Sequence, residues 1–157
     1  MDIAGLPLHA LVNHAAVVLT PLAVLTVIAF AVAPRYRYLT RWPTAVITVV
    51  SLLSVWIARI SGQALVTERP ELGPLVATHR SRAITLSYLM ILFTVVVLVG
   101  VWGLGGRSGL ISGGGDRDTR VGALDRVLVA AIVVMALVVL VWVLLTGDAG
   151  ARAVWGR

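Results

Sequence analysis

Three histidines are the side chains of this chain best suited to hold a metal or a cofactor. His9 and His14 lie near the start of the first apolar segment, and His79 lies just before the third. Imidazole is the commonest side-chain metal ligand. Residues five apart on a helix point about 140° away from each other, so His9 and His14 converge only if His9 sits in a non-helical entry. We therefore expect His9, His14 and His79 as a candidate metal site at one membrane face.

Arg59 is expected about one turn inside the second apolar segment, at the same membrane face. Its planar guanidinium matches a carboxylate such as a haem propionate, although arginines near a helix end often simply snorkel to the interface. Haem iron accepts axial histidines within a four-helix frame. The predicted cofactor-binding residues are therefore His14, His79 and Arg59, with His9 as an alternate ligand and haem b or a transition metal as the cofactor.

Two interpretations of these residues stay open. In the first, the protein is a redox-associated membrane subunit that binds haem b or a metal through its histidines. In the second, it is a non-catalytic structural or accessory membrane protein with no cofactor, in which the histidines serve helix packing. A catalytic enzyme is not indicated, because no nucleophile, base and acid can be grouped by spacing. The chain has no cysteine, which excludes disulfides and thiolate ligands.

Four apolar segments must position the histidines, at about residues 10–33, 44–60, 83–102 and 127–146. A bilayer core about 30 Å thick needs about 20 helical residues. In lipid, each backbone N–H and C=O must be satisfied within its own segment, which leaves only helices. The chain is 59% apolar and 13% charged. We therefore expect an all-α fold, an integral membrane four-helix bundle that forms a single domain over residues 1–157, with no convincing internal repeat.

The charges indicate how the bundle lies in the membrane. All 13 basic residues are arginines, which is typical of GC-rich bacterial genomes, and the net charge is +6. Because the arginines flank apolar segments, they favour anionic lipid headgroups over nucleic acid. Seven lie in the 34–43 and 103–126 loops and five on the other side. This excess favours cytoplasmic loops and extracytoplasmic termini, in a multi-pass protein of the bacterial inner (plasma) membrane.

The lipid bilayer is the expected partner, and other membrane redox subunits are candidate partners. Trp42, Trp102 and Trp142 lie near the predicted helix ends, as an interfacial aromatic belt requires. The glycine-rich stretch GLGGRSGLISGGGDRDTR is typical of a flexible linker. It lacks the preceding strand and the lysine that a phosphate-binding loop needs.

Two stretches, GLPLHALVNHAAVVLTPLAVL and SGQALVTERPELGPLVATH, resemble a bacterial membrane-protein family known as domain of unknown function 2231. Its members show G-L-P-x-H-P-L-x-V-H, an apolar helix containing a proline, a small-Gly-Glu element and a later histidine. The resemblance covers roughly residues 4 to 104. The matching residues are Gly5, Leu6, Pro7, His9, Leu11, His14, Ser61, Gly62 and His79.

The chain departs from that family pattern at three places. Ala10 replaces a proline, Gln63 replaces a glutamate, and arginines flank Ser81 where the family has a small or acidic run. Loss of the carboxylate at position 63 puts in doubt a proton-relay or cation-binding role there. A related domain occurs fused to Rieske iron–sulfur modules, so the resemblance implies proximity to electron transfer.

Overall fold

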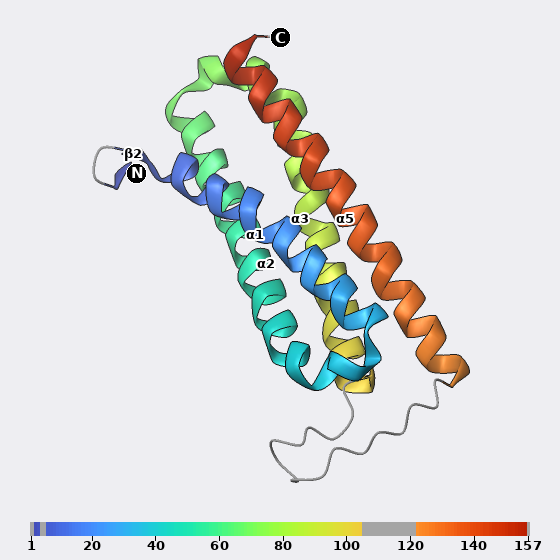
Figure 1. The fold of residues 1–157 in the computed structure, drawn as a ribbon. Coiled ribbons are helices and arrows are strands. Elements are labelled where there is room, and N and C mark those ends of the chain that lie inside the picture. Colours follow the sequence, from blue (N-terminus) through green and yellow to red (C-terminus); the bar gives the residue numbers. More distant parts are fainter. Residues whose placement is uncertain (1, 4–5, 105–121, 157) are drawn as a thin grey trace.

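The computed structural model describes residues 2–3, 6–104 and 122–156 (Figure 1). Four long helices make up most of this part of the chain. They are α1 (Leu8–Val32), α2 (Arg37–Glu68), α3 (Gly73–Leu104) and α5 (Ala123–Trp155). Each is long and apolar enough to cross a membrane. The prediction of an all-α membrane bundle is therefore confirmed.

Short turns connect the first three helices. The 3-10 turn Pro34–Tyr36 joins α1 to α2, and Pro70–Leu72 joins α2 to α3. Before α1, the two-residue strands β1 (Asp2–Ile3) and β2 (Leu6–Pro7) pair antiparallel. The predicted glycine-rich linker falls almost entirely within 105–121, outside the described residues.

Three of the helices extend well beyond the predicted apolar segments. The second segment was expected at 44–60, whereas α2 has 32 residues, which corresponds to about 48 Å of helix. Hydropathy delimits only the part of a helix that lies in lipid. Arginine, glutamine and glutamate are good helix formers, so the backbone continues as helix into the polar interface on either side.

The helices form a square bundle in the order α1, α2, α3, α5. Each packs against its two neighbours in this order, α5 closing on α1. Both termini lie at the same end of the bundle, as four crossings require (Figure 1). The core is apolar and fully buried, with Phe30, Met90, Phe93 and Ile132 at most 1% exposed.

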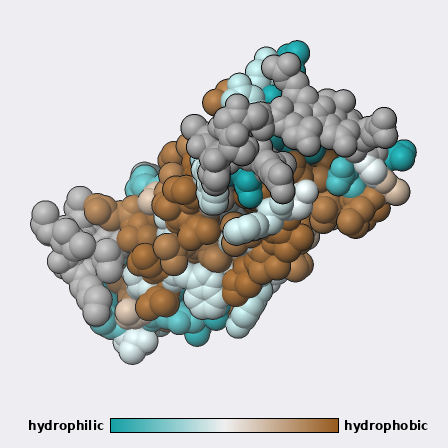
Figure 2. All heavy atoms as spheres, turned by 90° about the horizontal axis from the view of Figure 1, so that it is seen from below, coloured by the Kyte–Doolittle hydropathy of each residue, from teal (hydrophilic) through white to brown (hydrophobic). Residues whose placement is uncertain are grey.

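The outer faces of the helices are also apolar. Val18, Leu25, Leu53 and Leu144 are each more than half exposed although they lie within the candidate spans. Figure 2 shows broad hydrophobic areas on the surface of one face. In water such a surface would be a liability, whereas in lipid it matches the surrounding hydrocarbon.

The pattern of burial repeats between the first and third helices. Each buried residue of α1 has a buried counterpart in α3, 70 positions later in the chain. The register also pairs His9 with His79. The buried pairs are Ala16 and Leu86, Thr20 and Met90, Ala23 and Phe93, Val24 and Thr94, Val27 and Val97, Phe30 and Gly100, and Ala31 and Val101.

A second register, of 88 positions, relates α2 to α5. It pairs five buried residues of α2 with five of the six buried residues of α5. These pairs are Thr44 and Ile132, Thr48 and Ala136, Ser51 and Val139, Val55 and Val143, and Ala58 and Thr146. The hairpin α1–α2 therefore corresponds to the hairpin α3–α5, and in the square bundle an approximate two-fold axis along the bundle relates them. The expectation of no internal repeat is thus wrong at the level of structure.

Candidate functional site

His9 lies in the first turn of α1 and reaches across to α2. Its Nδ1 atom lies 3.0 Å from the carbonyl oxygen of Ala58 and 3.3 Å from Oγ of Ser61. A carbonyl oxygen only accepts, so Nδ1 carries the proton and donates to Ala58. The ring packs on Gly62, where a Cβ atom would come within 2.9 Å of His9 Cε1. Any residue other than glycine at position 62 would therefore displace the His9 ring.

His79 makes the equivalent arrangement in the other hairpin. Its Nδ1 atom donates to the carbonyl oxygen of Thr146 on α5, at 2.9 Å. Its ring packs on Gly150, where a Cβ atom would lie 3.0 Å from Nδ1. In both hairpins a histidine thus bonds one carbonyl and covers the glycine four residues further along the same helix. The two histidines are 70 positions apart and the two glycines are 88 positions apart, which are the same two registers that the burial pattern gives.

The two histidines meet near the axis of the bundle. Their ring centres are 6.4 Å apart and their planes are inclined by 75°. Because each Nδ1 donates to a carbonyl, each Nε2 keeps a lone pair free for a further ligand. A metal-binding histidine normally has this arrangement, with the other ring nitrogen held by a carbonyl or a carboxylate.

The protonation of His9 follows from its surroundings. Burial lowers the pKa of His9 below its usual value, the hydrogen bond to the Ala58 carbonyl opposes this shift, and nearby His79 lowers the pKa further. The lowered pKa favours the neutral form of His9. Neutral imidazole is the form that binds metal ions.

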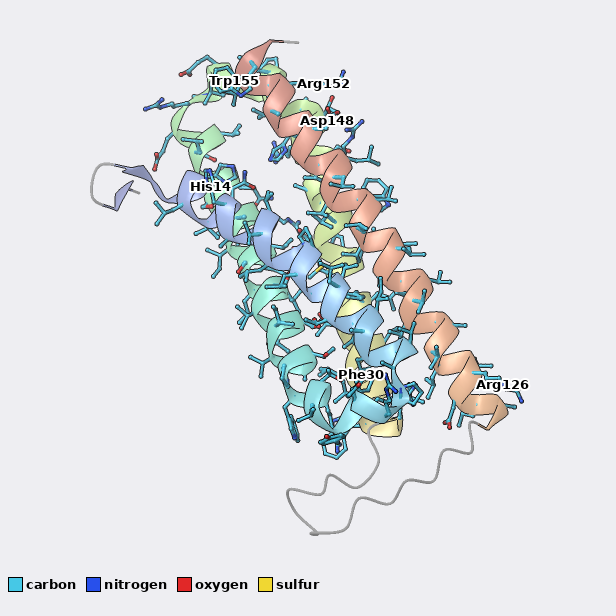
Figure 3. The ribbon with its side chains drawn as sticks, in the orientation of Figure 1. His14, Phe30, Arg126, Asp148, Arg152 and Trp155 are labelled. Carbon is cyan, nitrogen blue, oxygen red and sulfur yellow. The ribbon has the colours of Figure 1, made fainter. Side chains whose placement is uncertain are left out.

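His14 does not join this pair. The structure begins α1 at Leu8, so His9 is helical and the non-helical entry needed for His9 and His14 to converge is missing. His14 is exposed near the start of α1, at the same end of the bundle as Asp148 and Arg152 (Figure 3). Among the described residues, no group of three or more His, Asp or Glu side chains is placed to hold a metal ion.

A cavity of about 110 Å³ adjoins the histidine pair. It lies between the four helices at the end of the bundle that holds His9 and His79, and its walls are mainly apolar. The polar residues that line it are His9, Asn13, Arg59, Gln63, His79, Arg80 and Thr146. Most of these lack a polar equivalent in the other hairpin: Arg59 corresponds to Gly147 and Asn13 to Ala83. The polar lining of the cavity therefore does not follow the repeat of the two hairpins.

Arg59 connects the cavity to the lipid-facing surface. Its guanidinium carbon lies 4.9 Å from the Trp56 ring centre and 5.3 Å from the Tyr88 ring centre. Tyr88 is 57% exposed. The Nη1 atom of Arg59 is buried and has no hydrogen-bond partner in the described part of the chain. A buried guanidinium nitrogen without a partner is costly, so this atom indicates a place for an anionic or accepting group.

The sequence thus predicted His79, His9 and Arg59 at one end of the bundle, and the structure brings them to the same cavity. Sequence reasoning missed Gly150 and the two carbonyls, of Ala58 and Thr146, and it named Gly62 only as a match to the family motif. The available signal was the match of His9 with His79 and of Gly62 with Gly150 in the two registers. No family model, no curated protein and no solved structure matches this chain.

Proposed function

We propose that this protein is a redox-associated membrane subunit that binds haem b between His9 and His79. The observation that carries the proposal is the pair of carbonyl-bonded imidazoles, one from each hairpin, 6.4 Å apart between ring centres. A haem bound here would be held by the Nε2 atoms of His9 and His79, one from each hairpin. Haem supplies a one-electron centre of adjustable potential when bound.

The donor set suits haem better than a bare metal ion. A structural metal site usually needs four protein ligands, whereas the porphyrin provides four nitrogens of its own and leaves two axial positions. The two glycines under the histidine rings keep the rings close to their helices. The approximate two-fold axis supports the same conclusion, since it presents two equivalent ligands to the two equivalent faces of a flat ring.

Two arginines are available for the haem carboxylates. Arg59 and Arg80 both line the cavity, and the buried Nη1 atom of Arg59 has no protein acceptor among the described residues. A guanidinium binds a carboxylate through two parallel hydrogen bonds. The role predicted for Arg59 therefore has a structural basis, whereas in this proposal His9 takes the ligand position first given to His14.

The size of the cavity sets a condition for haem binding. Pockets for drug-sized ligands measure about 300–1,000 Å³, which is larger than the cavity of about 110 Å³. Haem binding therefore requires the helices beside Arg59 to separate, or the porphyrin edge to project between α2 and α3 towards lipid. The proposal predicts a difference between the haem-free and haem-bound bundles at this flank.

The experiment is absorbance of protein purified from a bacterial host supplied with a haem precursor. We expect a Soret band, a reduced-minus-oxidised difference spectrum and about one haem per chain. His9→Ala and His79→Ala should each lower haem occupancy at least about tenfold, because each removes an axial ligand. His14→Ala is the matched control and should keep the haem.

Two outcomes would contradict the proposal. Wild-type protein without a Soret band would favour the alternative, an accessory membrane protein that carries no cofactor. Haem retained by His9→Ala but lost by His14→Ala would restore the ligand pair first expected. We also propose kinship with the family of unknown function 2231, and extracytoplasmic termini in a bacterial plasma membrane, which reporter fusions to each terminus would test.

A further inference from the structure

Arg41, at the opposite end of the bundle from the histidines, lies between two tryptophans. Its guanidinium carbon is 5.2 Å from the Trp42 ring centre and 5.7 Å from the Trp102 ring centre. Arg41 is only 8% exposed, whereas Trp42 is 47% and Trp102 73% exposed. A buried cation is therefore covered by two indoles, from α2 and α3, that face the surroundings. We call Arg41, Trp42 and Trp102 the indole clamp.

The clamp lies at the depth of the membrane boundary. On α2, 17 residues without charge, 42–58, separate Arg41 from Arg59. They span about 26 Å of helix, less than the hydrocarbon core of about 30 Å. Arg41 and Arg59 therefore cannot both lie clear of the core, and because a charge within the core is costly, we expect both close to its edges. Tryptophan side chains also concentrate at this level of a bilayer.

The end of the bundle that holds the clamp is strongly positive. Its described residues include Arg35, Arg37, Arg41 and Arg126 but only one carboxylate, Asp125. Arg37 is engaged within the protein, since it donates to the carbonyl oxygens of Phe30 and Ala31. Together the cations of this end produce a field that attracts anionic headgroups, with an effect of about 1 kcal/mol for each basic residue near the surface.

We propose that the indole clamp binds the phosphodiester headgroup of an anionic phospholipid. The guanidinium of Arg41 provides the charge and the planar donor geometry that a phosphate needs. Trp42 and Trp102 hold that guanidinium and contact the glycerol region, where amphipathic rings are favoured. Arg35, exposed at the same end, adds positive charge. The site is separate from the histidine cavity and does not depend on haem.

The test counts lipids bound to the purified full-length protein by native mass spectrometry. After delipidation, the protein is titrated with phosphatidylglycerol, with phosphatidylcholine and with soluble glycerol 3-phosphate. We expect one phosphatidylglycerol to bind roughly tenfold more tightly than phosphatidylcholine, as one charge-assisted contact implies. Glycerol 3-phosphate should not compete, because it lacks the acyl chains that place the headgroup at the clamp.

Arg41→Gln and Trp102→Leu should each remove this preference. Arg126→Gln is the matched control: it removes one charge at the same end from an exposed arginine outside the clamp. An equal loss in Arg41→Gln and Arg126→Gln would show only a diffuse field and overturn the proposal. So would equal binding of the two phospholipids, or displacement by glycerol 3-phosphate. If Arg41→Gln fails to elute as a folded species, Trp102→Leu decides, because its exposed side chain leaves the core intact.

Discussion

Gly62 and Gly150 occupy equivalent positions in the two hairpins, and each lies directly beneath a histidine ring. A Cβ atom at Gly62 would approach His9 Cε1 to 2.9 Å, and one at Gly150 would approach His79 Nδ1 to 3.0 Å. The glycines therefore set how closely each imidazole lies against α2 or α5. In each hairpin the ring position in turn decides whether Nδ1 reaches the carbonyl four residues earlier.

Gly62→Ala and Gly150→Ala should therefore weaken the histidine site without unfolding the bundle. The added methyl group meets the end of a flexible side chain, so the ring can move away at little cost in stability. The displaced ring loses its carbonyl bond, and loss of such a supporting bond typically lowers metal-site affinity about 10–100-fold. Haem occupancy from absorbance measures the effect. Gly122→Ala, at the opposite end of the bundle, is the control, because nothing lies within 4 Å of a Cβ atom there, and equal haem loss in all three variants would refute this role.

Gly100→Ala should destabilise the bundle itself. A Cβ atom at this position would overlap Cδ1 of Ile132, and Ile132 is fully buried between α3 and α5. Overpacking of a dense core costs about 1–3 kcal/mol. Ile132→Val removes the overlapping carbon and should restore part of the loss in the double variant. Reversible unfolding in mixed micelles by SDS titration measures the free energies, and additive losses in the double variant would contradict this account.

The sequence predicted the four helices and the end of the bundle at which the histidines gather. It could not predict which histidines pair, because that depends on where α1 begins. A start at Leu8 turns His14 away from His9, whereas the two could converge only if the helix began later. Helix ends are set by local capping and packing, which hydropathy does not register.

The internal repeat was hidden for a different reason. Equivalent positions need the same depth of burial, but they do not need the same residue. Phe30 corresponds to Gly100 and Thr44 to Ile132, so the larger side chain lies on the first helix of one hairpin and on the second helix of the other. Packing conserves the total volume of a layer and not the identity of each residue. The sequence therefore keeps few identical pairs where the structure repeats, among them His9 with His79 and Gly62 with Gly150.

Thr20 and Ser51 should contribute a measurable hydrogen bond between α1 and α2. Their side-chain oxygens lie 2.9 Å apart, and both residues are fully buried. Hydrogen bonds between helices in membrane proteins contribute about 0.6 kcal/mol on average and at most about 1.7 kcal/mol. A double-mutant cycle with Thr20→Val and Ser51→Ala, read by SDS titration, should give a coupling in this range. A coupling of zero would mean that each hydroxyl finds another partner at no cost.

Arg37 should be the most important arginine for stability. Its Nε and Nη2 atoms donate to the carbonyl oxygens of Phe30 and Ala31, at 3.1 and 2.9 Å. These carbonyls lie in the last turn of α1, where no following helical N–H is available to them. Arg37 is 8% exposed, so water replaces the guanidinium poorly when it is removed.

Arg37→Leu should therefore cost about 1–3 kcal/mol, the usual penalty for buried acceptors left without donors. Arg37→Lys should recover only part of this loss, because a compact ammonium lacks the planar fork that reaches both carbonyls. Arg35→Leu is the control, since Arg35 is exposed two residues away and its charge is of the same sign. SDS titration of the three variants gives the comparison. If Arg37→Leu and Arg35→Leu unfold at the same SDS fraction, the charge of this end matters and the carbonyl bonds do not.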